Sequence, residues 1–521
     1  MRVVGRLLIF AWALGTCAAQ KPPLFSFSQQ FGPHPVGLRV VSQYDYSRTF
    51  RSATDPVGRP YVGERARPLQ TLIWYPAETS SKPPMTVNDY TVLLASETNF
   101  AKPMLSAEQK LNWIDGMSLS LATPLHSVLD SAMSPGRFPV VIYAPSFNAP
   151  SWENADLCEY LASFGYVVIA SPDMGAHTRE MTQDLTGIGA QAQDISFLIG
   201  YAQTLSDTDM TEVAVGGFSW GGISNLFAAA RDSRIDALFC LDGSLRYFPA
   251  LVTDAGDVHP DQMTIPLLYF TQGEQTIEDL VGPRFKKLDA PSVLNEWTHG
   301  DRIMVDMFGM VHAEYSAMYQ RNEDVWKSFP LLQKGDYSRE DGVTSYFWMA
   351  KYTLEFLNAY LKHDGAAMAY LQRTPAENGV PKHLMTAKYR AAAGRAPSLE
   401  AFRRELGRQG FEHAAKVYAA FQQENPDFTI SEVNLEMWAR EIIESGHLPE
   451  AVQLLKWNAE INAKSAGALT ALADAYQLNR QNDDAIDAYE KALELSVDNP
   501  LLKQAIEIQI RGLKGRASIE H

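Results

Sequence analysis

The middle of the chain alternates between short apolar runs and longer segments whose apolar residues recur at helical spacing. The runs are almost continuously apolar, as in FPVVIY at 138–143, which is typical of strands buried on both faces of a parallel sheet. Similar strands are predicted at 166–173, 211–217, 235–243, 265–273 and 302–308. Helical segments lie between them at 153–165, 191–205 and 220–232. This alternation predicts an α/β fold with a doubly wound, mostly parallel sheet, whose strand-following loops gather along one edge.

The same pattern sets the limits of this domain. Two strand-like runs at 36–46 and 67–77 precede the alternating core, and a helix-like segment at 345–361 closes it. Residues 372–397 are rich in Pro, Gly and Ala and poor in bulky apolar side chains, a composition typical of a linker. We therefore place the first domain at 20–371.

Beyond the linker, residues 398–521 keep helical spacing throughout and repeat themselves. Ala451 and Ala485 lie in the similar segments PEAVQLLKWNAE and DDAIDAYEKALE, at the period of about 34 residues found in the tetratricopeptide repeat. Small residues at this period let the two helices of a hairpin pack closely, and the pattern resembles that repeat. Generic helices with an accidental period are the alternative. The resemblance implies a small all-α domain that binds a protein partner or associates with itself.

The first 19 residues have the order of a secretory signal peptide. Arg2 and Arg6 precede an apolar stretch at 7–15, and small residues follow up to Ala19. The apolar stretch is too short to span a bilayer. We expect cleavage after Ala19 and a secreted or periplasmic protein with no transmembrane span. A lipid anchor on Cys17 is the second reading of this segment.

Charge and cysteine content exclude several partners. The sequence holds 45 Lys and Arg against 61 Asp and Glu, a net charge of −16, and loss of the signal peptide removes two arginines and makes the balance more acidic. Non-specific binding to nucleic acid or to anionic membranes needs a cationic surface, so neither is expected. Cys158 and Cys240 stand in apolar segments, which predicts buried free thiols. No cysteine spacing fits a metal site, and we expect neither a metal nor a cofactor.

One motif carries the candidate chemistry. Gly217, Ser219 and Gly221 form G-x-S-x-G between a predicted strand and a predicted helix. A strand-to-helix turn this tight strains the serine backbone and leaves no room for side chains beside it, so glycines are required there. Ser219 would then project from the sheet edge at a helix amino terminus, where the dipole favours developing negative charge. This context favours a nucleophile over an ordinary glycine-rich turn.

A serine hydroxyl needs a base that is oriented by a carboxylate. On sheets of this type the order along the chain is serine, acid, histidine. Asp242 ends the predicted strand that follows Ser219, and His312 lies just past the predicted strand at 302–308, so both are expected at the same edge as the serine. Glu274, after the next strand, is the alternative acid.

Acyl transfer also needs donors for the oxyanion. The backbone N–H of Trp220, directly after the nucleophile, is one expected donor. The other should come from the loop at 144–148, after the first long parallel strand. Phe147 is the candidate in that loop, since Pro145 has no N–H to give.

Together these residues resemble the α/β-hydrolase superfamily, in the branch of platelet-activating-factor acetylhydrolase and dienelactone hydrolase. The resemblance is carried by Asp45 and Arg48, by the segment WYPA, by GFSWGG and by the late VH that contains His312. It departs at 145–147, where that branch has His-Gly and this chain has Pro-Ser-Phe. The resemblance implies an enzyme without a metal that acts on small or short acyl esters.

The leading functional prediction is therefore a serine hydrolase that cleaves carboxylic esters through an acyl-Ser219 intermediate. A peptidase or amidase on the same three residues is the second prediction, because loops rather than the catalytic residues set specificity. A third, from a different class, is a catalytically idle hydrolase core that serves as a scaffold for the helical repeats. A small-molecule ester is the expected substrate in the first case.

Overall fold

The computed structural model describes residues 25–106, 109–110, 114–272, 293–328 and 336–517. The predicted signal peptide at 1–19, with Cys17, lies outside these residues, and so does Glu274. The chain divides into two compact units. The first runs to Ala391 except for residues 261–264, and the second comprises residues 261–264 and the chain from Ala392 onward.

The first unit is built on a ten-stranded sheet with the order β10-β9-β8-β7-β6-β4-β5-β2-β1-β3. The strands are β1 (Val36–Thr49), β2 (Ala66–Pro76), β3 (Ser127–Leu129), β4 (Phe138–Ala144), β5 (Val167–Ala170), β6 (Thr208–Phe218), β7 (Ala237–Leu241), β8 (Leu267–Gln272), β9 (Arg302–Met307) and β10 (Met385–Arg390). Strands β4 to β9 pair in parallel, whereas β2 and β10 join this block antiparallel. The predicted mostly parallel sheet is confirmed.

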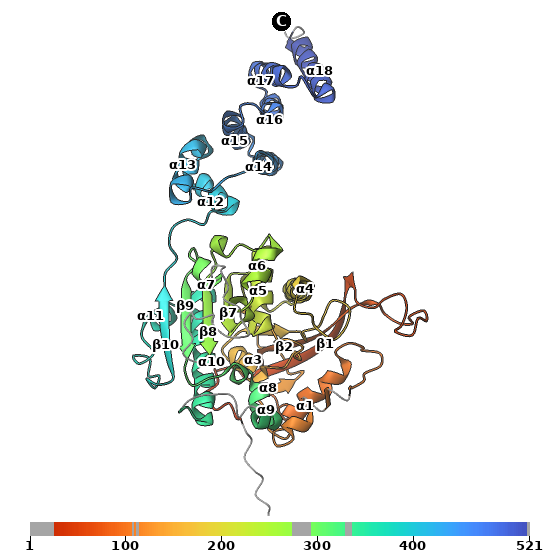
Figure 1. Ribbon diagram of the computed structural model, residues 1–521, viewed down its shortest axis with the longest axis vertical. Helices are drawn as coiled ribbons and strands as arrows, with labels where there is room; N and C mark the ends of the chain where they lie inside the picture. Colours follow the sequence, from red (N-terminus) through yellow and green to blue (C-terminus); the bar gives the residue numbers. More distant parts are fainter. Residues whose placement is uncertain (1–24, 107–108, 111–113, 273–292, 329–335, 518–521) are drawn as a thin grey trace, which may run out of the picture. The chain divides into compact units, whose positions relative to one another are not determined.

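Helices cover both faces of the sheet (Figure 1). The chain passes from β4 through α3 (Ala155–Ser163) to β5, and then back past β4 through α4 (Leu185–Ala202) to β6. Because such crossovers are right-handed, a reversal of direction puts α3 and α4 on opposite faces. Accordingly α3 packs with α10 (Arg339–Leu361), and α4 packs with α5 (Trp220–Arg231). All nine residues of α3 are buried, so this helix lies inside the core.

Shorter helices fill the connections. They are α1 (Val87–Val92), α6 (Pro249–Ala255), α7 (Val293–Glu296), α8 (Ala317–Arg321), α9 (Glu323–Ser328) and α11 (Gly365–Gln372). None of the helices in the described part of the chain is long and apolar enough to cross a membrane. The predicted buried free thiols, Cys158 and Cys240, are confirmed.

The predicted linker at 372–397 needs a correction, because residues 385–390 of that range form β10. This strand pairs antiparallel with β9, with Met385 opposite Met307. Its side chains alternate between packed and exposed positions, and only Met385 is fully buried. An edge strand is held by backbone pairing on one side and needs few bulky apolar residues, so its composition resembles that of a linker.

The second unit consists of helices that pack in chain order. They are α12 (Leu399–Gln409), α13 (Ala414–Glu424), α14 (Glu432–Glu444), α15 (Leu448–Ile461), α16 (Ala466–Leu478), α17 (Asn482–Leu495) and α18 (Pro500–Ala517). The pairs α14–α15, α15–α16 and α16–α17 are all in contact. Ala451 and Ala485 are fully buried where the helices pack. The predicted helical C-terminal region is therefore present.

Candidate active site

The sharp turn between β6 and α5 holds Ser219 in strained backbone geometry. Its φ is 53° and its ψ is −115°, a region that residues with a side chain rarely adopt. A Cβ atom on Gly217 or Gly221 would collide with the carbonyl oxygen of Ala144, and one on Gly222 would collide with Gly243. The glycines are thus required by close backbone approach, and the turn presents Ser219 at the carboxyl edge of the sheet.

Three loops bring Ser219, Asp242 and His312 into one hydrogen-bonded chain. Asp242 follows β7, and His312 opens a short 3-10 helix (His312–Tyr315) after β9. The distance from His312 Nε2 to Ser219 Oγ is 2.9 Å, and the distance from His312 Nδ1 to Asp242 Oδ2 is 2.6 Å. The Asp242 side chain is completely buried, whereas 39% of the His312 side chain is exposed. The contact at Nδ1 favours the tautomer in which Nδ1 carries the proton and Nε2 faces the serine.

Two further residues, which no sequence motif marks, hold these three side chains in place. The hydroxyl of Tyr247 donates to Asp242 Oδ1 at 2.8 Å. Gln272, at the end of β8, accepts a hydrogen bond from the backbone N–H of His312 at 2.8 Å. Burial, followed by the nearby Asp242 carboxylate, raises the pKa of Tyr247, so this phenol stays a donor. Asp242 is therefore bonded at both oxygens.

The loop after β4 lies beside the turn that carries Ser219. The rings of Phe147 and Trp220 meet edge to face with their centroids 5.7 Å apart. Among the described residues, neither backbone N–H has a hydrogen-bond acceptor. The structure thus places both predicted oxyanion donors on adjoining loops with their N–H groups uncommitted.

A buried acidic residue, Glu153, stands close to this edge. Burial raises the pKa of Glu153 to about 7, whereas hydrogen bonds from Ser146 and the nearby His312 act in the opposite direction. Glu153 could not be singled out from the sequence, because only its contacts in the folded chain distinguish it from any other glutamate. Within the described residues, no group of three or more His, Cys, Asp or Glu side chains is arranged to hold a metal ion.

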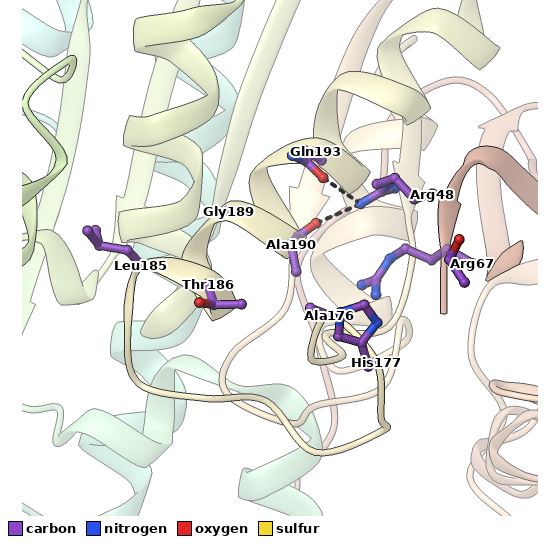
Figure 2. A pocket seen from close by; sticks show the side chains of 10 residues that line it. Arg48, Arg67, Ala176, His177, Leu185, Thr186, Gly189, Ala190 and Gln193 are labelled. Atoms are coloured by element: carbon purple, nitrogen blue, oxygen red, sulfur yellow. Dashed lines mark hydrogen bonds between the residues drawn. The ribbon is translucent and has the colours of Figure 1, made fainter. Parts of the chain in front are cut away.

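A separate pocket of about 430 Å³ borders the loop after β5 and the start of α4 (Figure 2). Arg48 donates there to Ala190 O and to Gln193, at 3.1 and 3.4 Å. Arg48 and Arg67 are also both paired with Asp194. The cationic side chains of this pocket are therefore already committed to partners within the protein.

Comparison with known proteins finds similarity to solved structures. No protein-family model matches the chain, and neither does any curated protein. Among solved structures, the chain is similar to a ferulic acid esterase from Streptomyces cinnamoneus, with a TM-score of 0.44 and 17% sequence identity. The match covers 65% of this chain and 93% of the esterase. Function therefore rests on the geometry of the site itself.

Proposed function

We propose that the protein is a serine hydrolase that cleaves small or short-chain carboxylic esters through an acyl-Ser219 intermediate. The observation that carries this proposal is the unbroken hydrogen-bonded chain from Asp242 through His312 to Ser219. Such a chain gives a weak nucleophile a base, and gives the base a carboxylate that balances its charge. The strained backbone of Ser219 adds support, because strain of this kind is retained mainly at functional sites.

In the acylation step, His312 Nε2 takes the proton of Ser219 Oγ while Oγ bonds to the ester carbonyl carbon. The carbonyl oxygen becomes an oxyanion, which the N–H groups of Phe147 and Trp220 stabilise. When the tetrahedral intermediate collapses, the bond to the alcohol oxygen breaks. The leaving alkoxide takes the proton from His312, and the alcohol departs. The Asp242 carboxylate stabilises the imidazolium while it exists.

In the deacylation step, the roles repeat with water as the nucleophile. His312 Nε2 takes a proton from water as the water oxygen bonds to the acyl carbon. The second tetrahedral intermediate releases Ser219, which recovers its proton from His312, and the carboxylic acid leaves. The partial exposure of the His312 side chain gives water the access that this step needs.

The competing functions make different predictions in one assay series. The series uses p-nitrophenyl esters of increasing acyl length, a p-nitroanilide of the best acyl group, and a fluorophosphonate that labels activated serines. The proposal expects ester turnover that is highest with short acyl groups, little anilide turnover, and labelling that is lost in Ser219→Ala. A higher rate on the anilide would favour the peptidase or amidase. No labelling and no turnover by the wild type would favour the idle scaffold.

For the second unit, we propose tetratricopeptide-like hairpins that bind a protein partner or a second copy of the chain. The support is a structural period: α14 and α16 begin at 432 and 466, and α15 and α17 begin at 448 and 482, each pair at the period of about 34 residues. Ser431 and Ser465 cap the first helix of each hairpin in the same way. Removal of residues 398–521 should leave ester turnover intact and abolish the association.

We further propose export through the segment at 1–19, which the mature protein would lack. Mass measurement of the mature amino terminus tests this directly. A start at Gln20 supports cleavage after Ala19, a lipid-modified Cys17 supports the anchored form, and an intact Met1 contradicts both.

A further inference from the structure

The turn at 145–149, which carries the candidate oxyanion donor, has nearly all of its other polar groups engaged. Ala149 N–H donates to Ser146 O at 2.9 Å and closes the turn. Gln191 donates to Pro145 O at 2.9 Å. Asn148 has a φ of 59°, and both its side-chain oxygen and its side-chain nitrogen are hydrogen bonded. The N–H of Phe147 is therefore uncommitted in a turn whose other polar groups are nearly all hydrogen bonded.

A buried carboxyl group holds the residue before Phe147. Glu153 accepts from Ser146 N–H at 2.9 Å and from Ser146 Oγ at 2.5 Å, and the Glu153 side chain is fully buried. These two bonds hold the Ser146 side chain and the 145–146 peptide, which directly precedes the peptide that carries the Phe147 N–H.

A second buried carboxyl group holds the residue after it. Asp173 accepts from Asn148 N–H at 2.8 Å and is also fully buried. Within the described part of the chain, the other oxygen of Asp173 has no hydrogen-bond partner. Among the described residues, the Asp173 side chain therefore accepts a single hydrogen bond, from the N–H of Asn148.

The loop that carries Asp173 is itself anchored. Arg67 donates to Met174 O at 3.0 Å and to Gly175 O at 2.7 Å, and Figure 2 shows its side chain beside the turn at Ala176 and His177. Arg179 donates to Asp173 O at 2.6 Å and to Asn148 O at 3.1 Å, and so ties this loop to the turn at 145–149. Asp173 therefore acts from a fixed position.

We propose that Glu153 and Asp173 are positioning residues. They clamp the 145–146 and 147–148 peptides, which lie on either side of the peptide that carries the Phe147 N–H, and so aim this N–H at the oxyanion. This inference rests on the proposed function. Burial of a carboxyl group costs free energy unless its bonds compensate. Two such groups flank the Phe147 N–H. They accept hydrogen bonds from the N–H groups of Ser146 and Asn148, the residues on either side of Phe147. A donor misplaced by about 1 Å loses much of its effect.

The two groups need to accept hydrogen bonds, not to carry charge. Burial raises the pKa of Asp173 as well as that of Glu153, which shifts both groups toward the neutral form. A glutamine at 153 can accept from Ser146 N–H through its oxygen and donate to Ser146 Oγ through its nitrogen. An asparagine at 173 can still accept from Asn148 N–H. Glu153→Gln and Asp173→Asn are therefore conservative, whereas Glu153→Leu and Asp173→Leu remove the clamps.

The test measures kcat and KM on p-nitrophenyl acetate, with active sites counted by fluorophosphonate labelling and folding checked by thermal unfolding. Removal of an oxyanion donor costs about 10²–10³-fold in kcat, and we expect about 10²-fold for each leucine variant with KM nearly unchanged. Glu153→Gln and Asp173→Asn should stay within about fivefold of the wild type. Ser146→Ala removes one of the two bonds to Glu153 and should cost only a few-fold.

The outcomes separate this inference from the proposed function. Full kcat per labelled site in both leucine variants would overturn the clamp while ester hydrolysis stands. Equal losses in the leucine and amide variants would also overturn it, because charge and not the acceptor would then matter. An inactive wild type would overturn the proposed function, and the clamp with it. Hydrogen exchange should show faster exchange at 144–149 in Glu153→Leu and wild-type exchange there in Glu153→Gln.

Discussion

The turn at Ser219 and the turn at 145–149 hold adjoining parts of one site by opposite means. Each contains a residue with a side chain in left-handed backbone geometry, Ser219 at φ 53° and Asn148 at φ 59°. At Ser219 the geometry is kept by absent side chains, because glycines allow close backbone approach. At 145–149 it is kept by added acceptors, the buried carboxyl groups of Glu153 and Asp173.

The two turns should therefore respond to different substitutions. A turn fixed by sterics is sensitive to one extra methyl group and insensitive to the loss of a polar partner. A turn fixed by hydrogen bonds tolerates a change of charge as long as the acceptor stays. Substitutions in each turn can therefore distinguish a turn that is fixed by steric fit from one that is fixed by hydrogen bonds.

The largest effect is expected at the acid that serves Ser219. Asp242→Asn should lower kcat about 10⁴-fold, as the same change does in serine proteases, because the histidine takes the wrong tautomer. Glu274→Gln should stay near the wild type. Steady-state kinetics on a p-nitrophenyl ester measures both variants, and the reverse pattern would assign the acid to Glu274.

One methyl group should break the turn at Ser219. In Gly221→Ala the new Cβ meets the carbonyl oxygens of Ala144 and Pro145, so the backbone must move, and kcat should fall about 10²-fold or more. Gly189→Ala is the matched control, because nothing lies within 4 Å of the Cβ it would add. That variant should keep its activity and gain up to about 1 kcal/mol of stability, since glycine is unfavourable inside a helix. Equal kinetics in the two variants would show that steric fit does not fix Ser219.

A buried carboxyl group away from both turns can be compared with Glu153 and Asp173. Glu159, in α3, accepts from Tyr90 OH and from His126 N–H, and burial raises the pKa of Glu159 to about 7. The folded chain thus keeps a proton that the unfolded chain releases near its ordinary value of 4.5. The free energy of unfolding should therefore fall as pH rises between these two values, by at most about 3 kcal/mol.

Urea denaturation at pH 5 and pH 8 measures this loss. Glu159→Gln should make the dependence shallower, because the glutamine does not titrate, whereas Glu153 and Asp173 still contribute. Glu78→Gln, at an exposed position, should keep the wild-type slope. An unchanged slope in Glu159→Gln would contradict the raised pKa.

The smallest effect is expected at the hydroxyl that supports Asp242. Tyr247→Phe removes the donor to Asp242 Oδ1 but leaves the bond to His312, and kcat should fall about tenfold, which corresponds to about 1.4 kcal/mol. Tyr360→Phe removes a similar bond, to Asp301 at 2.7 Å, and should change stability without changing kcat. A loss of kcat in the second variant alone would contradict the role of Tyr247.

The sequence predicted those parts of the molecule that local patterns encode. Continuous apolar runs identified the buried strands, because a strand with both faces covered has no polar positions. The spacing of Gly217 and Gly221 around Ser219 identified the strained turn. Asp242 and His312 could be proposed because parallel strands deliver their following loops to one edge, and the structure does bring these residues together.

The missed parts depend on contacts that no local pattern records. The β10 strand has only alternate packed residues, so its composition resembles that of a linker. Asp173 meets Asn148 only because β4 and β5 are neighbours in the sheet. Glu153 is distinguished by its burial and by its hydrogen bonds with Ser146, and the neighbouring residues in the sequence indicate neither.

The most direct test of the central claim is to trap the acyl-enzyme. The protein is mixed with p-nitrophenyl acetate, quenched in acid within the first turnover, digested, and mapped by mass spectrometry. The acyl-Ser219 mechanism predicts a burst of p-nitrophenolate that approaches one equivalent, and an acetyl group on Ser219. An acetyl group on another residue, or hydrolysis with no trapped acyl-enzyme and full activity in Ser219→Ala, would contradict it.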